Sequence, residues 1–324
     1  MNNSNELRDL TLPHEMLLYD YPSPSAPAGR YAATIGFFDG VHQGHRHLLR
    51  QLRGVAASRG LRSMVVTFDR HPRQVVLPGW EPQLLTTLDE KKLLLSQTGV
   101  DALVTLRFDA SMSGLSSRQF MADVLRRHLG VALLLTGYDN RFGHDRSSTF
   151  ADYQRYGRES GMEVVAATPL SCGAETFSSS LARRLLAGGD VALAAECLGR
   201  CYALTGTVVH GERNGHAIGF PTANLQPDDR QKIIPARGAY AVRAVLADGT
   251  CHNAMTNIGL RPTFGGQEAT IETHIFGLQG DIYGQRLTLS FVERLRDEQT
   301  FTSPDELAAQ LARDRQAASP NERR

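Results

Sequence analysis

Two histidines on either side of a Gln-Gly pair are the first residues of this chain that could do chemistry. They close the stretch Thr34-Ile35-Gly36-Phe37-Phe38-Asp39-Gly40-Val41-His42-Gln43-Gly44-His45, which follows a short β-branched and aromatic run. A strand that ends in a glycine-containing turn and enters a helix forms a phosphate site, because the first helical N–H groups lack partners and the helix dipole is positive there. The two histidines could therefore stabilise negative charge on a phosphate.

The helix pattern that follows brings both imidazoles to a helix N-terminus. One face carries Leu48, Leu49, Leu52, Val55 and Ala56, and the opposite face carries His47, Gln51 and Ser58. His45 heads the buried face, and His42 lies in the loop before it. A histidine in such a position is often only a packing residue. The functional interpretation is favoured because six motif residues occur together, namely Gly36, Asp39, Gly40, His42, Gly44 and His45.

Short apolar strands alternate with helices in the first half of the chain. Residues up to about Arg30 are polar and then proline-rich, and we expect a lead-in arm there. We expect strands from Tyr31 and over 63–68, 101–106, 131–136 and 163–168, and helices over 89–98, from Ser116 or Ser117 to Leu129, over 149–160 and over 190–198. This alternation predicts a doubly wound α/β fold, a parallel sheet with helices on both faces.

Polar clusters follow several of these strands. They are the histidine stretch, residues 69–73, residues 137–146 and the run from Ser178 to Arg183. Ligands of such sheets bind at the carboxyl ends of the strands, so these loops are expected to converge on one site. Each has a simpler interpretation: Arg73 and Arg146 could be solvated charges, and a serine run before a helix is commonly an N-cap.

The second half of the chain contains β-like runs without intervening helices. They cover residues 202–209, 239–246, 251–257, 270–276 and 287–292, with turn residues such as Asp248-Gly249 between them. This predicts an antiparallel sheet or barrel. A closing helix begins at Ser303, with Pro304 at its first position and Glu306 completing a capping box. We divide the chain into domains of residues 1–189 and 190–324.

Two polar features of the second half could also bind phosphate or a metal. Glycines recur from Gly206 to Gly219, and Gly-Phe-Pro-Thr-Ala-Asn follows at residues 219–224. Glycine lets backbone amides approach phosphate, and Thr222 and Asn224 offer uncharged oxygens to a hard cation. A glycine-rich loop between strands is more often only a turn. Glu272 and His274 share one strand face, and on alternation alone this could equally be a solvated polar face.

The composition narrows the class of protein. A chain of 324 residues with 41% hydrophobic content indicates two globular domains. A net charge of +1 gives no reason to expect nucleic acid or a membrane as partner. The four cysteines, Cys172, Cys197, Cys201 and Cys251, are expected to be reduced thiols, with the 197/201 pair one turn apart in a helix. No signal peptide or membrane-length apolar run is visible, so we expect a cytoplasmic monomer or weak homo-oligomer.

The motifs together resemble one family. Gly-x-Phe-Asp-Gly-Val-His-x-Gly-His resembles the signature of the bacterial bifunctional riboflavin kinase/FMN adenylyltransferases, within the His-x-Gly-His nucleotidyltransferase superfamily. Gly-Phe-Pro-Thr-Ala-Asn and Thr-Ile-Glu-Thr-His at residues 270–274 resemble its kinase domain. The resemblance extends from about Tyr31 to Asp314. The chain departs from the family at Phe37, where many members carry asparagine, at Asn140, and at Ala182, which replaces isoleucine.

The resemblance implies substrates and site residues. Riboflavin, FMN, FAD and ATP would be substrates or products, with Mg²⁺ as cofactor. For adenylylation it implies ATP binding by Gly36, Phe38, Asp39, Gly40, His42, Gly44, His45, Ser179, Ser180 and Arg183, and flavin binding by Phe68, His71, Pro72, Asp139, Asn140 and Phe142. For the kinase it implies ATP binding by Gly206, His210, Gly211, Gly215, Gly219, Pro221, Thr222 and Asn224, Mg²⁺ on Thr222 and Asn224, and Glu272 as catalytic base.

The expected chemistry differs between the two reactions. Phosphoryl transfer to the ribityl hydroxyl needs a base, whereas the FMN phosphate that attacks the second ATP is already an anion. His42 and His45 would thus stabilise charge and not act as nucleophiles. One rival is a nucleotidyltransferase for phosphopantetheine or nicotinate mononucleotide, which would lack the Gly-Phe-Pro-Thr-Ala-Asn barrel. Another is a flavin-binding regulator without turnover, against which the intact His42, His45 and Glu272 argue.

Overall fold

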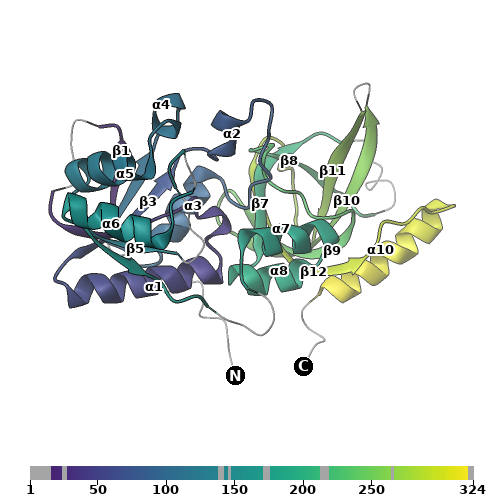
Figure 1. The fold of residues 1–324 in the computed structure, drawn as a ribbon. Helices are drawn as coiled ribbons and strands as arrows, with labels where there is room; N and C mark the ends of the chain where they lie inside the picture. The colour runs from purple at the N-terminus through teal and green to yellow at the C-terminus, as the bar shows by residue number, and fades with distance from the viewer. Residues whose placement is uncertain are drawn as a thin grey trace. The chain divides into compact units, whose positions relative to one another are not determined.

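The structure, a computed structural model, consists of two packing units (Figure 1). It describes residues 16–23, 28–137, 142–144, 147–170, 176–211, 219–263 and 266–319. Unit 1 comprises residues 1–82 and 86–176, and unit 2 comprises residues 83–85 and 177–324. No helix in these described ranges is long and apolar enough to cross a membrane.

Unit 1 is built on a six-stranded sheet in which all strand pairs are parallel. Its strands are β1 (Leu17–Tyr21), β2 (Tyr31–Ile35), β3 (Arg62–Phe68), β4 (Ala102–Leu106), β5 (Val131–Thr136) and β6 (Glu163–Ala166). The spatial order is β1-β4-β3-β2-β5-β6. The strand order therefore reverses at β2: β3 and β4 follow on one side of it, and β5 and β6 follow on the other. Such a switch point is where open α/β sheets bind ligands.

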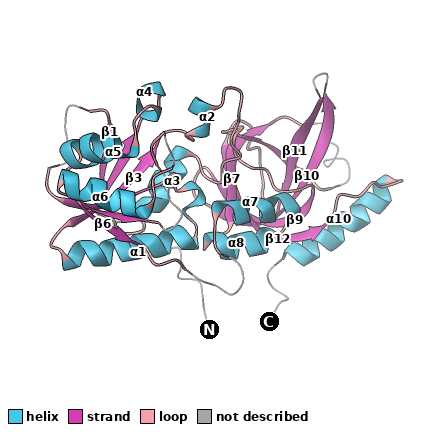
Figure 2. Cartoon of the chain, in the orientation of Figure 1, coloured by secondary structure: helices cyan, strands magenta, loops and turns pink. Residues whose placement is uncertain are grey.

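Helices cover both faces of this sheet, as predicted (Figure 2). α1 (Gln43–Ser58) and α3 (Leu88–Ser96) pack on one face, and η2 (Phe120–His128) and α6 (Phe150–Ser160) on the other. Short helices α2 (Arg73–Val76), α4 (Ala110–Ser113) and α5 (Ser117–Gln119) complete the unit. Neighbouring strand residues alternate between the two cores: Ala32 packs with α1, and Ala33 packs with η2. The period-2 pattern of a buried strand explains this division.

The lead-in arm predicted up to Arg30 is wrong in one part. β1 forms an edge strand, in parallel register with β4 from Leu17↔Ala102 to Tyr21↔Leu106. Its alternate residues Leu17, Tyr19 and Tyr21 pack against the core, and Leu18 is exposed. A five-residue half-buried strand within a polar, proline-rich segment gives too short a periodic signal to be recognised.

Unit 2 is a closed six-stranded antiparallel barrel with helices before and after it. Its elements are α7 (Ser179–Gly188), α8 (Val191–Leu198), β7 (Tyr202–Val209), β8 (Ala223–Pro227), β9 (Gly238–Leu246), β10 (Cys251–Thr263), β11 (Gly266–Ile275), β12 (Arg286–Arg296) and α10 (Pro304–Ala318). The strand order β10-β11-β8-β7-β12-β9 closes through the β9–β10 pair. The predicted barrel and closing helix are confirmed, but the capping box predicted for Glu306 is wrong, because its carboxylate accepts from the N–H and hydroxyl of Thr302. β8 was not predicted, because its start lies in the Gly-Phe-Pro-Thr-Ala-Asn segment, which was interpreted as a phosphate- or metal-binding loop or a turn and not as a strand.

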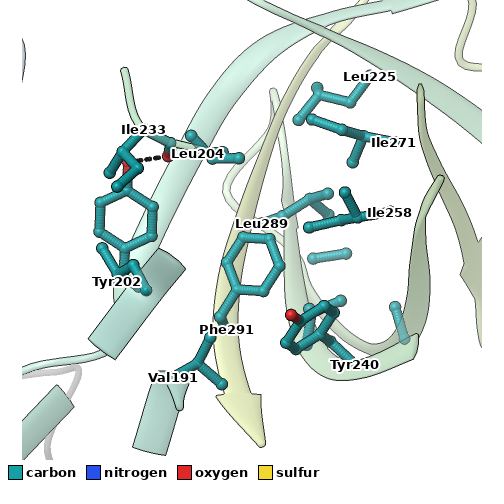
Figure 3. Packing of buried hydrophobic residues seen from close by; sticks show 14 of the residues in the cluster. Val191, Tyr202, Leu204, Leu225, Ile233, Tyr240, Ile258, Ile271, Leu289 and Phe291 are labelled. Atoms are coloured by element: carbon teal, nitrogen blue, oxygen red, sulfur yellow. Dashed lines mark hydrogen bonds between the residues drawn. The ribbon is translucent and has the colours of Figure 1, made fainter. Parts of the chain in front are cut away.

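The barrel core joins strand residues to the preceding helices. Figure 3 shows Phe291 of β12 next to Val191 of α8, and both side chains are fully buried. The hydroxyl of Tyr202 donates to the carbonyl of Ile233 at 2.6 Å, so this buried polar group is satisfied. Ala182 and Leu186 of α7 lie in the same core, so α7 packs as part of unit 2. The functional boundary after residue 189 stays a prediction.

The cysteines require one correction. Cys197 is buried within α8, but Cys201 is exposed beyond the helix end at Leu198, so the two are not on one helix as expected. Gly199, in the left-handed region at φ 72°, ends the helix before that turn is complete. The three cysteines among the described residues are free, and Cys172 lies outside those residues.

An ion pair attaches α10 to the barrel. Nε of Arg296 on β12 donates to both carboxylate oxygens of Asp314 at 3.1 and 3.0 Å, and its terminal nitrogen lies 2.8 Å from Oδ2. The two side chains are only 13% and 5% exposed. Gln310 donates to the same carboxylate at 2.8 Å. A buried pair of this geometry is costly to break from one side, so it fixes where the last helix lies against β12.

Substitution of two helical glycines of unit 1 by alanine is expected to change the free energy of unfolding in opposite directions. A Cβ at Gly157 in α6 would lie 2.6 Å from both the Met162 carbonyl oxygen and Cγ2 of Val164, whereas one at Gly54 in α1 would meet nothing within 4 Å. We expect Gly157→Ala to lower the free energy of unfolding by roughly 1–3 kcal/mol through overpacking. We expect Gly54→Ala to raise it by about 0.5–1 kcal/mol. Urea unfolding of both variants checks this, and equal effects would contradict it.

Candidate active sites

The turn between β2 and α1 is held in an uncommon backbone conformation. Phe38 and Val41 have φ values of 54° and 40°, in the left-handed region that side chains with a Cβ rarely adopt, and Gly40 has a φ of 78°. Such residues cost roughly 1–3 kcal/mol each and persist only where their surroundings fix them. Phe38 and Val41 are buried among the side chains of α1 and β3, which supplies part of that fixation.

Asp39 supplies the rest through Thr86, a residue that sequence reasoning missed. Oδ1 of Asp39 accepts from the backbone N–H of Thr86 at 3.0 Å and from its hydroxyl at 3.1 Å. The same hydroxyl oxygen accepts from the backbone N–H of Gly40 at 3.0 Å. Asp39 and Thr86 are 3% and 4% exposed, so these bonds form in a medium where unpaired groups are costly. Asp39 therefore shapes the turn.

His42 and His45 lie stacked at the N-terminus of α1. Their ring centroids are 3.6 Å apart with an interplanar angle of 25°. His42 is the N-cap, and its Nδ1 accepts from the backbone N–H of His45 at 3.3 Å. A neutral His42 consequently carries its proton on Nε2. The sequence prediction that both histidines head this helix is matched by their placement, which puts one imidazole in the cap and the other in the first turn.

The His45 ring is held neutral. Burial lowers the pKa of His45 well below its usual value, and the nearby His42 and Lys91 lower it further. Its Nδ1 is buried and has no hydrogen-bond partner among the described residues. An imidazolium at this place would be desolvated beside another imidazole and an ammonium, so these surroundings favour the neutral form of His45.

An apolar cavity of about 390 Å³ opens at the carboxyl ends of β2 and β3. Four residues predicted to bind flavin line it, namely Phe68, His71, Pro72 and Phe142, together with Gly36 from the histidine turn. Sequence reasoning missed Phe37, Phe108, Met112, Leu115 and Phe120, which line the same cavity. The aromatic rings contact one another edge to face, as between Phe37 and His71 at 4.8 Å. Asp139 and Asn140, also predicted here, lie outside the described residues.

Three residues predicted to bind the adenylylation ATP lie in unit 2. Ser179 and Ser180 begin α7, whose N-cap Ser178 accepts from the backbone N–H of Leu181 at 3.1 Å. Nε of Arg183 donates to the carbonyl of Gln83 at 2.7 Å, within the same unit. The N-cap interpretation thus holds for Ser178. Phosphate binding by Ser179, Ser180 and Arg183 stays a prediction.

In the barrel, strand register places three polar residues in one row. Glu272 of β11 is the direct partner of Asn224 on β8 and of Asn257 on β10. Side chains directly opposite each other in a ladder project from the same face, so the carboxylate lies between two amides. Asn257 was not among the predicted site residues, because register across three strands cannot be read from spacing along one.

Two cavities of the barrel unit share Thr222 in their lining, and one of them contains Glu272 and Asn257 of this row. One, of about 490 Å³, is lined by Pro221, Thr222, Asp281 and Tyr283 among others. The other, of about 300 Å³, is lined by Glu272, Asn257 and Thr222, with apolar walls that include Phe220, Met255, Leu307 and Leu311. The last two belong to α10, and the Arg296–Asp314 pair lies at the same wall.

The predicted kinase glycines have different structural roles. A Cβ at Gly206 would collide with the main chain of Gln226, so this glycine permits close strand pairing in the barrel. A Cβ at Gly211 would overlap the Asn224 side chain, so the backbone there lies directly on that amide. Gly219 occupies a turn at φ 80°. The ring centroids of His210 and Tyr283 are 3.9 Å apart, and Tyr283 lines the larger cavity. Gly215 lies outside the described residues.

His274 supports the Gly-Phe-Pro-Thr-Ala-Asn segment. Its Nδ1 lies 2.9 Å from the carbonyl oxygen of Pro221, and its ring meets Phe220 edge to face at 5.2 Å. Burial lowers its pKa, although the Pro221 contact acts in the opposite direction. A neutral His274 with its proton on Nδ1 can donate to that carbonyl. His274 therefore fixes the residue that precedes Thr222.

The chain matches the family models described as FAD synthetase over residues 25–181 and riboflavin kinase over residues 198–320, and these matches define it as a nucleotide-dependent transferase. It belongs to the bifunctional riboflavin kinase/FMN adenylyltransferase family. It is an enzyme of flavin cofactor synthesis.

Individual relatives span nearly the whole chain. The bifunctional riboflavin kinase/FMN adenylyltransferase of Escherichia coli K12 is 38% identical, covering 89% of this chain and 92% of the relative. That of Haemophilus influenzae is 35% identical, with the same coverage of both chains. The crystal structure of a macrolide-efflux protein from Streptococcus pneumoniae aligns with a TM-score of 0.83 at 30% identity, covering 94% of this chain and 99% of the other.

The Asp39–Thr86 contact yields a prediction for the first site. Thr86→Val keeps the side-chain volume but leaves Asp39 and the Gly40 N–H without the hydroxyl, at a cost of roughly 1–3 kcal/mol for each buried group. We expect FAD formation to fall at least about tenfold while FMN formation from riboflavin is unchanged. Thr98→Val is the control, because its hydroxyl donates only to Leu95 in its own turn. Equal rates in the two variants would show that this contact does not matter for adenylyl transfer.

Proposed function

We propose that the barrel unit phosphorylates riboflavin through Glu272, Thr222 and Asn224, and that the α/β unit adenylylates FMN through His42 and His45. The observation that carries the kinase assignment is the position of Thr222 in the lining of both barrel cavities, with Glu272 in one of them. Phosphoryl transfer requires a donor and an acceptor on either side of one point. Two cavities that share Thr222 support this assignment.

The smaller barrel cavity suits riboflavin. Its apolar walls, formed by Phe220, Met255 and Leu307 among others, can enclose a planar ring system, while Glu272 and Asn257 can meet a polyhydroxyl chain. ATP occupies the larger cavity. Glu272 takes the proton of the ribityl hydroxyl as it attacks the γ-phosphorus, and ADP leaves on the side of the larger cavity.

Thr222 and Asn224 are the residues that would hold Mg²⁺. Among the residues that the structure describes, no three His, Cys, Asp or Glu side chains form a cluster that could hold a metal, so the cation would depend on uncharged protein oxygens and ATP phosphates. The residues fit this role, because Gly211 packs on the Asn224 amide and Pro221 is held by His274. When bound, Mg²⁺ would neutralise charge on the transferred phosphoryl group.

In the α/β unit, the FMN phosphate attacks the α-phosphorus of a second ATP and pyrophosphate leaves. The cavity of Phe68, His71 and Phe142 takes the flavin ring. His42 donates through Nε2 toward the developing charge, and the N-terminus of α1 adds its positive dipole end. Gly36, Phe38, Asp39, Gly40 and Gly44 shape the turn that brings these groups to the nucleotide.

The remaining assignments rest on composition. A net charge of +1 supports small-molecule substrates without nucleic acid as partner. We place the enzyme in the cytoplasm, as a monomer or weak homo-oligomer. The residues that follow residue 189 are assigned to the kinase domain and those before it to the adenylyltransferase domain.

A reciprocal pair of variants tests the assignment of residues to reactions. Glu272→Gln keeps the side-chain shape but cannot take a proton, so riboflavin phosphorylation should fall by roughly 10²-fold or more. His42→Ala should abolish FAD formation from FMN and leave FMN formation near wild type. Chromatography of the products over time, with riboflavin or FMN as substrate, measures both reactions. Loss of both activities in either folded variant would show that the residue does not belong to one reaction.

Asn224→Ala tests the proposed metal site. We expect it to raise the Mg²⁺ concentration needed for riboflavin phosphorylation several-fold, because Mg²⁺ bound through few protein oxygens depends on each of them. Riboflavin affinity without nucleotide should change less. The competing interpretation is a turn asparagine that satisfies only local backbone groups. A lower melting temperature with an unchanged Mg²⁺ requirement, measured at a temperature where the variant is folded, would favour that interpretation.

A further inference from the structure

A lysine that the chemistry above does not use lies buried beneath the flavin cavity of unit 1. Lys91, on α3, is only 3% exposed. Its Nζ donates to the carbonyl of Phe37 at 3.1 Å and to the carbonyl of Phe68 at 3.0 Å. It also lies 4.2 Å from the centroid of the Phe37 ring. An ammonium is rarely buried without a specific set of acceptors, so these contacts define its position closely.

The two carbonyls mark the place where the central strands separate. β2 and β3 pair in parallel up to Ile35↔Val66, and the Gly36 N–H still donates to the Val66 carbonyl at 3.1 Å. Beyond this point Phe68 ends β3 and Phe37 enters the histidine turn. The Phe37 carbonyl accepts from Lys91 and from the Thr67 hydroxyl, at 3.2 Å for the latter. Where the backbone hydrogen bonds between β2 and β3 end, the side chains of Lys91 and Thr67 therefore donate to the main-chain carbonyls instead.

Both residues that Lys91 holds are walls of the cavity assigned to flavin. Phe37 and Phe68 line it together with His71 and Phe142. We propose that Lys91 is a positioning residue for FMN in adenylyl transfer, because its ammonium fixes the main chain that presents the Phe37 and Phe68 rings to the flavin. This inference rests on the proposed flavin-binding role of the cavity.

The charges around Lys91 keep it protonated at neutral pH. Burial lowers its pKa from 10.5 to about 8, against the opposing effect of Asp39 and Asp69, while Lys92 lowers it further. Asp39 reaches it from the histidine turn and Asp69 from the end of β3, and His45 of α1 is held neutral beside it. Above pH 8 the ammonium becomes an amine, whose hydrogen bonds to the two carbonyls are weaker.

Deprotonation of Lys91 affects FMN binding and protein stability in opposite directions, so the two effects can be distinguished. In the unfolded chain a lysine stays protonated up to its ordinary value of 10.5, so between about pH 8 and 10.5 the unfolded state binds more protons. The contribution of Lys91 to the free energy of unfolding therefore increases with pH in this window. A loss of FMN affinity over the same window cannot come from Lys91-linked unfolding, and it would report the weakened hold on Phe37 and Phe68.

The test compares Lys91→Met with Lys92→Met in the full-length enzyme. The two lysines are neighbours on α3, but Lys92 is 27% exposed and lies 3.9 Å from Asp20. We expect Lys91→Met to raise the KM for FMN in FAD formation at least about tenfold, with kcat and the KM for ATP within about threefold of wild type. Riboflavin phosphorylation by the same protein, and all constants of Lys92→Met, should be unchanged.

Direct binding of FMN without ATP, followed by quenching of flavin fluorescence, gives a second measurement on wild type. The Kd for FMN should rise as pH increases from 7 to 9.5, and this rise should be absent in Lys91→Met. An unchanged KM for FMN in folded Lys91→Met would overturn the proposal, as would a fall in kcat alone. If Lys91→Met does not fold, a flat pH profile of wild-type FMN binding would overturn it. Absence of FMN binding to wild type near neutral pH would instead refute the flavin assignment of the cavity.

Discussion

Hydrogen bonds between Asp39 and Thr86 are the contact on which the first site depends. The chain leaves β2 through a turn with Phe38 and Val41 in the left-handed region, a conformation that would not persist alone. The Asp39 carboxylate binds the N–H and hydroxyl of Thr86, and the hydroxyl holds Gly40. With the turn fixed in this way, α1 begins at the point where His42 caps it. The geometry of both imidazoles thus follows from one carboxylate, whose Oδ1 accepts hydrogen bonds from Thr86.

In the barrel unit, strand register and not a strained turn positions the polar residues of the site. Strand register alone aligns Glu272 with Asn224 and Asn257, because a closed ladder leaves no freedom for one strand to slip. What register cannot provide is a wall for the cavity beside Glu272. The pair Arg296–Asp314 provides it by holding α10 against β12, so that Leu307 and Leu311 line the cavity. An antiparallel barrel needs such an added element, because its own interior is filled by side chains.

Sequence periodicity was sufficient to predict most helices and strands and to locate the polar residues that follow the strands. The strand before His42, the helix after it and the turn at Asp248-Gly249 each leave a local pattern. Thr86 and Lys91 leave none, since their partners lie 47 and 54 residues away in the chain. Phe68, His71 and Phe142 belong to motifs and could be predicted as site residues, whereas Phe108 and Phe120 reach the same cavity only through packing. β1 was not predicted, because five alternating residues at a sheet edge give too short a hydrophobic period to be recognised.

The two proposed chemistries explain why the polar groups differ between the units. A ribityl hydroxyl must lose a proton as it attacks, so the kinase site needs a carboxylate such as Glu272 that can accept one. An FMN phosphate is already ionised, and a carboxylate facing it would only repel it. In unit 1 Oδ1 of Asp39 is accordingly occupied by Thr86, and burial keeps His45 neutral. A neutral His45 imidazole avoids the desolvation cost of a buried charge, and the N-terminus of α1 supplies the positive potential that a neutral ring does not.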